Sequence, residues 1–354
     1  MPNRTSPQNP IIGNVADEDG IKDKLVEVVE NAVKEGASVL LGELHRRAPF
    51  MLVEHRRIRA GFERRLSKRW KRAFALLEMV LVSAQETVED FDRTNRTQAA
   101  ANNDFVFEAL HLLAVRACRT ASEVFALLRT GHADGALARW RTLHELAVLA
   151  FFIAKNSSDT AERYLLHRFI EKRDAAKEYQ LHCLKLNMQP LNAEEFAEVS
   201  GIADSLAEKY GPRYWDRYGW AHATVVRADP QFHKKGQVTF GDLERFCELR
   251  HFRPHYRFAS HKVHAGAQGD YESLGVIRGR RLNLVGASNT GLSDPGQNTC
   301  ISLVQVITCV LTHSSQDPMG LVAAHALRLL SDEACHEFVD IQREIEEEES
   351  RSAS

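Results

Sequence analysis

The chain has 354 residues, of which 44% are hydrophobic, so it can bury a large core as one helical domain or as a main domain with an appendage. Its 46 basic and 48 acidic residues give a formal net charge of -2, which provides no overall attraction to nucleic acid or to a membrane. Six scattered cysteines without a C-x-x-C pair, and a polar N-terminus without an apolar signal core, indicate a reduced, cytoplasmic protein. The apolar runs 146–154 and 301–311 are shorter than the roughly 20 residues that a bilayer requires, so no transmembrane segment is expected.

The first half of the chain predicts long helices. We expect residues 1–18 to be disordered and 19–65 to form a basic helical hairpin. Between Pro49 and Pro190 there is no proline, and the only glycines are Gly61, Gly131 and Gly135, so strong helix breakers are nearly absent. One apolar stripe with a spacing of four predicts a helix that runs past Asp90; it consists of Ile58, Phe62, Leu66, Trp70 and Phe74.

Further helices are expected to complete an all-α bundle over residues 66–345. The expected ranges are 103–130, 133–156, 159–186, 193–210, 240–250, a helix from Pro254, 297–313 and 319–349. Asp134 and Asp159 are candidate caps near two helix starts. Residues 266–297 carry seven of the 20 glycines and predict a loop that holds a β-hairpin across 275–286. Residues 346–354 are expected to form an acidic, disordered tail.

The segment Tyr256–His264 carries the most informative polar pattern. On a helix, Arg257, Ser260, His261 and His264 share an arc about 100° wide, whereas Tyr256 points elsewhere. A cation, a hydroxyl and two imidazoles on one side could bind an anion or perform acid–base chemistry on a phosphodiester.

A second polar pair lies in an otherwise apolar helix. Arg141 and Glu145 are four residues apart, and buried charges need partners because an unpaired buried charge is strongly destabilising. The pair either is a structural ion pair that fixes helix docking or faces Ser260 and His264 in one polar site.

These motifs resemble a bacterial family. The run Gly131–Glu145, Trp220 and the run Tyr256–Gly266 are similar to the family called domain of unknown function 5677, over roughly residues 66–330. Its signature of Arg-x-x-x-Glu followed by Ser-x-x-x-His falls on Arg141, Glu145, Ser260 and His264. The family implies no established activity.

A more distant resemblance is to the HEPN helical nucleases, whose motif places an arginine four to six residues before a histidine. Arg257 precedes His264 by six intervening residues, and Arg250 precedes His255 by four. The resemblance implies a metal-independent endoribonuclease in which a histidine deprotonates the ribose 2′-hydroxyl and an arginine holds the phosphate.

We therefore expect a cytoplasmic RNA-cleaving or RNA-binding protein of the toxin or phage-defence kind. His264 would be the acid–base and Arg257 the phosphate holder, with Arg141, Glu145 and Ser260 orienting them. The alternative is a non-catalytic helical interaction module in which the polar cluster only fixes the fold. The two hypotheses predict different surroundings for the histidine. Catalysis needs an imidazole in an open, accessible cleft, whereas a scaffold needs a buried and saturated hydrogen-bond network.

RNA and a second copy of the chain are the expected partners. Residues 46–72 hold eleven Lys and Arg, and Arg64, Lys68 and Arg72 lie on a face that could follow a phosphate backbone or meet the acidic C-terminal residues. In the glycine-rich loop, Arg278, Arg280 and Arg281 could contact phosphate. No cofactor or metal is expected, because the histidines at 251, 255, 261 and 264 have no carboxylate neighbour before Asp270.

Overall fold

The structure, a computed structural model, describes residues 16–229, 231, 236–264, 267–277, 283–313 and 318–353. It divides into two units, Met1–Phe62 and Glu63–Ser354. The predicted sites at Arg278, Arg280 and Arg281 lie outside the described residues, as does the centre of the predicted β-hairpin. The fold is all-α, and the described part of the chain contains no β-strand.

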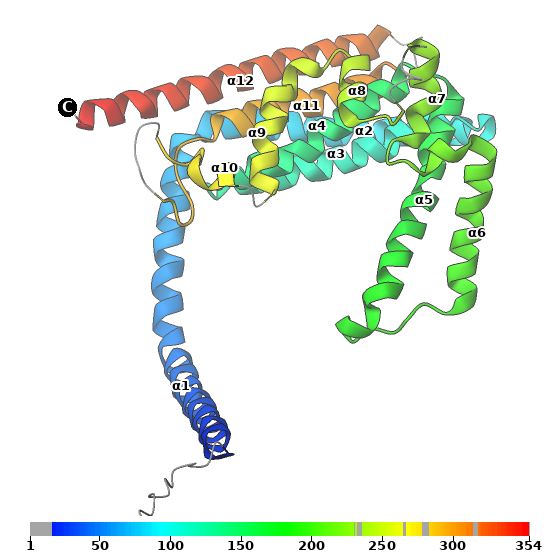
Figure 1. Cartoon of the computed structure of the whole chain (residues 1–354). Coiled ribbons are helices and arrows are strands. Elements are labelled where there is room, and N and C mark those ends of the chain that lie inside the picture. The colour runs from blue at the N-terminus through cyan, green and yellow to red at the C-terminus, as the bar shows by residue number, and fades with distance from the viewer. Residues whose placement is uncertain are drawn as a thin grey trace, which may run out of the picture. The chain divides into compact units, whose positions relative to one another are not determined.

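Twelve labelled α-helices follow one another along the described chain (Figure 1). Their bounds are α1 Ala16–Arg69, α2 Lys71–Asn102, α3 Phe105–Arg129, α4 Ala133–Ala154, α5 Ser158–His182, α6 Ala193–Tyr210, α7 Gly219–Ala228, α8 Phe240–Phe246, α9 Arg253–Val263, α10 Ala267–Tyr271, α11 Ser293–Leu311 and α12 Pro318–Ala353. Short 3-10 helices occupy Cys183–Leu186, Pro212–Trp215 and Arg250–Phe252.

The two ends of the chain differ from the expectation. A single helix, α1, runs through Pro49 where a helical hairpin was expected. At the other end α12 continues through the acidic residues to Ala353, where a disordered tail was expected. Glu346 and Glu347 accept hydrogen bonds from the Ser350 hydroxyl and the Arg351 guanidinium through their backbone carbonyls, and this pairing supports the last turns.

Helix starts in the second unit are set by side-chain caps. Asp104 accepts from the backbone N–H of Phe107 and begins α3. Capping boxes formed by Asn192 with Glu195 and by Thr239 with Asp242 begin α6 and α8. The predicted caps Asp134 and Asp159 instead lie inside the first turns of α4 and α5, where a negative charge is favourable to the helix dipole.

The core of the second unit surrounds α4 and α11. Helices α2, α3, α4, α11 and α12 pack side by side as a bundle (Figure 1). Trp140 on α4 is fully buried, and its indole N–H donates to the Ser302 hydroxyl of α11 over 3.0 Å. Gly296 of α11 lies against the Phe338 ring of α12, where an added Cβ would come within 2.5 Å of a ring carbon. These contacts place α4 at the centre, so polar groups on α4 must find partners inside the protein.

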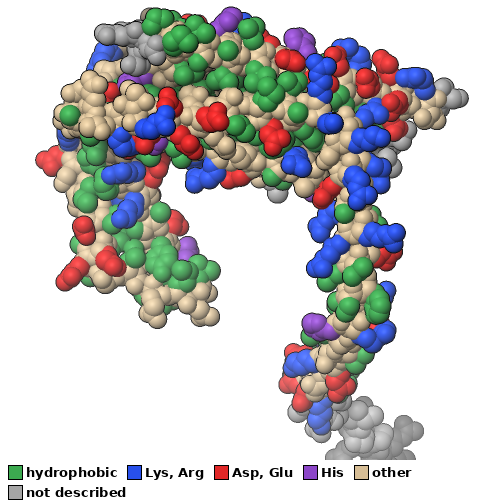
Figure 2. Space-filling model, turned by 180° about the vertical axis from the view of Figure 1, so that it is seen from behind, with side chains coloured by type: hydrophobic (Ala, Val, Ile, Leu, Met, Phe, Trp, Pro, Cys, Tyr) green, Lys and Arg blue, Asp and Glu red, His purple; other side chains and the backbone are tan. Residues whose placement is uncertain are grey.

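Helices α5 and α6 form a hairpin that projects from the bundle (Figure 1). Its far end exposes apolar side chains, seen as a green cluster in Figure 2: Leu181, Leu184, Leu186 and Met188. Two hydrogen bonds between the Gln180 side chain and the Leu191 backbone close this end. The hairpin is therefore held at its tip as well as at its base.

All six cysteines are free thiols, and five of them are buried. Burial raises the pKa of the Cys118 and Cys335 thiols from an ordinary 9.0 to about 11. Burial likewise raises the pKa of Cys247 and Cys309 to about 12. These thiols therefore lack the thiolate character that a reactive cysteine requires.

Within the described part of the chain, no helix combines the length and apolar character that a membrane crossing needs.

Candidate functional site

A hydroxyl from α9 lies between the two charges of α4. The Tyr256 hydroxyl donates to Glu145 Oε1 over 2.6 Å and accepts from Arg141 Nη2 over 2.7 Å. Arg141 Nη2 also lies 3.4 Å from Glu145 Oε1, and the guanidinium carbon lies 4.7 Å from the centre of the Tyr256 ring. Burial raises the pKa of Tyr256, and its hydrogen bond to Glu145 raises it further. The phenol therefore stays protonated and acts as the donor to the carboxylate.

A second cluster lies directly beside the first. Glu244 of α8 is fully buried, and its Oε1 is 3.1 Å from Nε2 of His144, which is also fully buried. Arg253, at the start of α9, places Nη1 2.8 Å from the other carboxylate oxygen as an ion pair without hydrogen-bond angles. A hydrogen bond across this contact requires a proton either on Nε2 of His144 or on the Glu244 carboxyl.

The two clusters share the Tyr256 ring. The ring centre lies 4.9 Å from that of Phe240 and 5.9 Å from that of His144. The Arg253 guanidinium carbon is 5.4 Å from the same ring centre. One aromatic side chain therefore links α4, α8 and α9, and we call the combined set the Tyr256 network: Arg141, Glu145 and Tyr256 with His144, Glu244 and Arg253.

The predicted partners Ser260 and His264 do not join Arg141 and Glu145. Ser260 donates to the Tyr256 carbonyl of its own helix over 2.8 Å. His264 caps the C-terminus of α9, and its side chain is exposed. Among the described residues, neither side chain has a hydrogen bond to Arg141 or Glu145. The reason is geometric. Tyr256 and Ala259 form the buried face of α9, so the side of this helix that packs on α4 is not the side that carries the predicted polar arc.

The predicted phosphate holder is also on the solvent face. Arg257 and His261 are exposed, like His264, and in the described part of the chain none of these three side chains has a hydrogen bond or an ion pair. An imidazole that is to act as a general base needs a partner that sets its tautomer and orientation. Arg257, His261 and His264 thus belong to the solvated face of an amphipathic helix, whereas Ser260 is half-buried.

The basic residues near the start of α2 fall into two groups. Arg72 pairs with Glu333 and Glu337 of α12, each at 3.3 Å. Arg69 pairs with Glu348 over 2.8 Å and lowers the pKa of that exposed carboxyl. Arg64 and Lys68 are exposed and form no ion pair with a described residue. The acidic helix therefore neutralises part of the basic face only.

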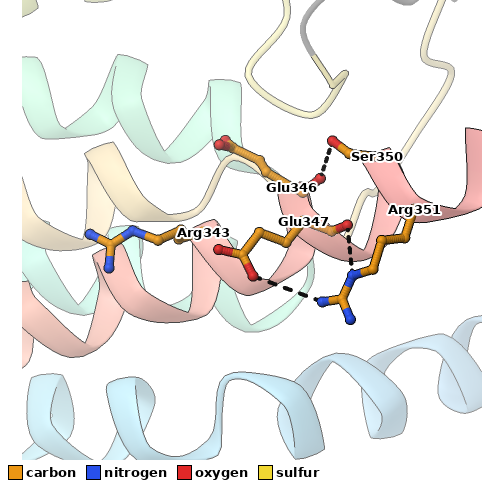
Figure 3. Close-up of a pocket in the computed structure, with 5 residues that line it drawn as sticks. All are labelled: Arg343, Glu346, Glu347, Ser350 and Arg351. Atoms are coloured by element: carbon orange, nitrogen blue, oxygen red, sulfur yellow. Dashed lines mark hydrogen bonds and ion pairs between the residues drawn. The ribbon is translucent and has the colours of Figure 1, made fainter. Parts of the chain in front are cut away.

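Two surface cavities lie away from the network. One of about 390 Å³ is bounded by side chains of a single helix, α12: Arg343, Glu346, Glu347, Ser350 and Arg351. Figure 3 shows Ser350 paired with Glu346 and Arg351 paired with Glu347. The other, of about 360 Å³, lies at the start of α4 beside Asp134 and Gly275. No group of three or more His, Cys, Asp or Glu side chains that could hold a metal ion exists among the described residues.

The sequence did not reveal four members of the network: Tyr256, His144, Glu244 and Arg253. Tyr256 was placed off the polar arc, although it lies only 40° around a helix from Ser260. Glu244 and Arg253 carried no motif. The available signal was the carboxylate of Glu244 on the helix face that carries Phe240 and Leu243, since a charge on a buried face needs a partner.

The fold and the network together define an all-α bundle whose central helix docks its neighbours through buried polar groups. Residues 107–276 match the model of a family of unknown function, DUF5677. The matched stretch contains every residue of the Tyr256 network. No curated protein and no solved structure matches the chain.

Proposed function

We propose that the chain is a non-catalytic helical interaction protein whose Tyr256 network fixes the docking of α4, α8 and α9. The observation that supports this role is the saturation of the network's hydroxyl: Tyr256 donates to Glu145 and accepts from Arg141. A phenol engaged in this way has no free proton to deliver to a substrate. The rest of the network is only partly satisfied, because Arg141 Nε, His144 Nδ1 and Glu244 Oε2 are buried without a hydrogen bond. Its hydrogen bonds and ion pairs nevertheless join α4, α8 and α9 and favour one arrangement of these helices.

The competing hypothesis is the metal-independent ribonuclease of the toxin or phage-defence kind that the HEPN resemblance suggests. It needs His264 and Arg257 to act together on a phosphodiester. Both side chains project into solvent without an orienting partner among the described residues. The nuclease role would therefore require these two side chains to move into a shared site, whereas the interaction role requires no such movement.

An RNA-integrity assay tests the proposal. Purified wild type is incubated with mixed-sequence RNA at several protein concentrations, beside His264→Ala and Arg257→Ala. We expect intact RNA in every reaction and unchanged thermal stability of both variants, since each side chain is exposed. RNA cleavage by wild type that His264→Ala abolishes would overturn the proposal in favour of the nuclease.

Binding of RNA without cleavage is a second candidate function. The supporting observation is that Arg64 and Lys68 remain exposed and unpaired among the described residues. Their charges are free to replace the counterions of a phosphate backbone, so binding should weaken steeply with salt.

The matched variants for this second function come from the same face. Arg64→Glu/Lys68→Glu removes the free cations, whereas Arg72→Glu removes one that already faces Glu333 and Glu337. RNA affinity measured at low and moderate salt should fall more in the double variant, with a shallower salt slope. Equal affinity of wild type and the double variant would exclude this face as an RNA site.

A further inference from the structure

The first unit exposes an apolar stripe along α1. At 100° per residue, six apolar side chains between residues 29 and 58 fall within an arc about 60° wide, which also includes Arg47. They are Val29, Val33, Leu40, Leu44, Met51 and Ile58, and each is between 43% and 64% exposed. Figure 2 shows apolar side chains among the charged ones along this helix. We call this set the α1 stripe.

A helix of this kind needs a partner. Helices in water gain most of their stability from packing an apolar face, and propensity alone leaves an isolated helix marginal. Its valines have modest helix propensity, and Pro49 removes one backbone hydrogen bond from the helix interior. The α1 stripe therefore marks a surface that is covered in the working protein.

The charges of this unit identify the partner. Residues 17–35 carry seven acids and three lysines, a net charge of -4, whereas residues 46–62 carry five arginines and one glutamate, a net charge of +4. On the helical wheel Asp23 and Arg59 lie beside the α1 stripe, and neither forms an ion pair with a described residue. Equal and opposite charge at the two ends of one helix is complementary to the same helix in reverse.

We propose that α1 pairs with α1 of a second copy of this chain in antiparallel orientation. The two charged stretches are centred near positions 26 and 54, so the two-fold axis falls near their midpoint, Leu40. Gly36 and Gly42 flank this position, and nothing lies within 4 Å of an added Cβ at either. The pair is isologous, with each acidic end facing the partner's basic end. This pairing deepens the proposed interaction role by naming one partner.

The first test is the mass of the full-length chain in solution, measured by light scattering after size-exclusion chromatography. Wild type, with a chain mass of 40.0 kDa, should elute at twice that mass. Arg56→Glu/Arg57→Glu/Arg59→Glu should weaken dimerisation about tenfold or more, because the two-fold axis repeats every lost charge pair. In a parallel pair like charges already face each other, so the same reversal would not weaken it.

Two controls separate pairing from unfolding and from charge in general. Arg168→Glu/Lys172→Glu/Lys177→Glu makes the same charge change on exposed positions of α5 and should leave the dimer intact. Asp23→Lys/Glu27→Lys/Glu30→Lys should weaken the dimer, and an equimolar mixture with the α1 arginine variant should restore it. Restoration in the mixture requires that both altered helices still form.

Cysteine cross-linking tests the orientation. Leu40→Cys, near the axis, should form an intermolecular disulfide under mild oxidation. Val26→Cys should not, because its counterpart would lie about 42 Å away along the antiparallel pair, 28 residues at 1.5 Å each. A monomeric wild type at high micromolar concentration, or efficient cross-linking through Val26→Cys, would overturn the proposal. Either result leaves the outcome of the RNA-integrity assay unchanged, so the two proposals fail separately.

Discussion

Removal of one oxygen atom tests whether the Tyr256 network supports the fold. Tyr256→Phe keeps the ring and its packing but deletes the donor to Glu145 and the acceptor for Arg141. A hydrogen bond to a charged group contributes about 1.5–3 kcal/mol. The contributions of the two bonds do not simply add, because Arg141 and Glu145 keep their own contact at 3.4 Å in the variant. These two side chains are also 19% and 24% exposed, so water can replace part of the lost hydrogen bonding. We expect the free energy of unfolding to fall by about 2 kcal/mol.

Urea denaturation followed by tryptophan fluorescence measures this change, with Tyr179→Phe as the matched control. The Tyr179 hydroxyl donates to the Gln189 carbonyl at an exposed position, so its removal should cost less than about 1 kcal/mol. Glu145→Gln, alone and combined with Tyr256→Phe, completes a cycle that should show coupling of about 1 kcal/mol. Equal losses in Tyr256→Phe and Tyr179→Phe, or independent effects in the cycle, would refute the reasoning.

Three further outcomes follow from buried groups. Glu244→Ala should lower the free energy of unfolding by about 3 kcal/mol, because it leaves His144 and Arg253 without their carboxylate; a loss below about 1 kcal/mol in a urea titration would contradict this. Gly296→Ala should lower the melting temperature, because overpacking against Phe338 costs about 1–3 kcal/mol, and an unchanged melting curve would show that the ring can move. The free energy of unfolding should fall as pH rises from 9 toward 12, because thiols with raised pKa values bind protons more tightly in the folded state. The contribution of these thiols to stability is complete below pH 9 and is lost as pH passes about 11 to 12. A free energy of unfolding that does not change over this range would contradict the burial of the thiols.

The helix positions could be predicted from the sequence because their signals are local. The scarcity of proline and glycine between Pro49 and Pro190, together with apolar periodicity, gave the all-α fold and most helix ranges to within a few residues. The continuity of α1 was not predicted, because Pro49 and the nearby glycines indicated a break. Their penalties are local, however, and the helix continues through them.

The site was harder to predict because its partners are distant in sequence. The charges at Arg141 and Glu145 indicated a need for partners, and the structure supplies one on α9, the helix that was expected. The residue itself was missed, because a shift of 40° around a helix separates a buried hydroxyl from a solvated one. His144 and Glu244 are 100 residues apart, and only the packing of α8 onto α4 brings them together.

The far half of the projecting α5–α6 hairpin should unfold locally and independently of the rest of the second unit. The buried residues of α6 are Ala203 and Ala207, both in its second half, and those of α5 lie mainly in its first half. The far half is held by the short-range hydrogen bonds of Gln180 and Tyr179, so it can open without exposing the bundle core. Amide protons there should exchange with deuterated solvent well before those of α4 or α11. The same property makes positions 187–192 a suitable place to insert a tag or a protease site while the bundle stays folded.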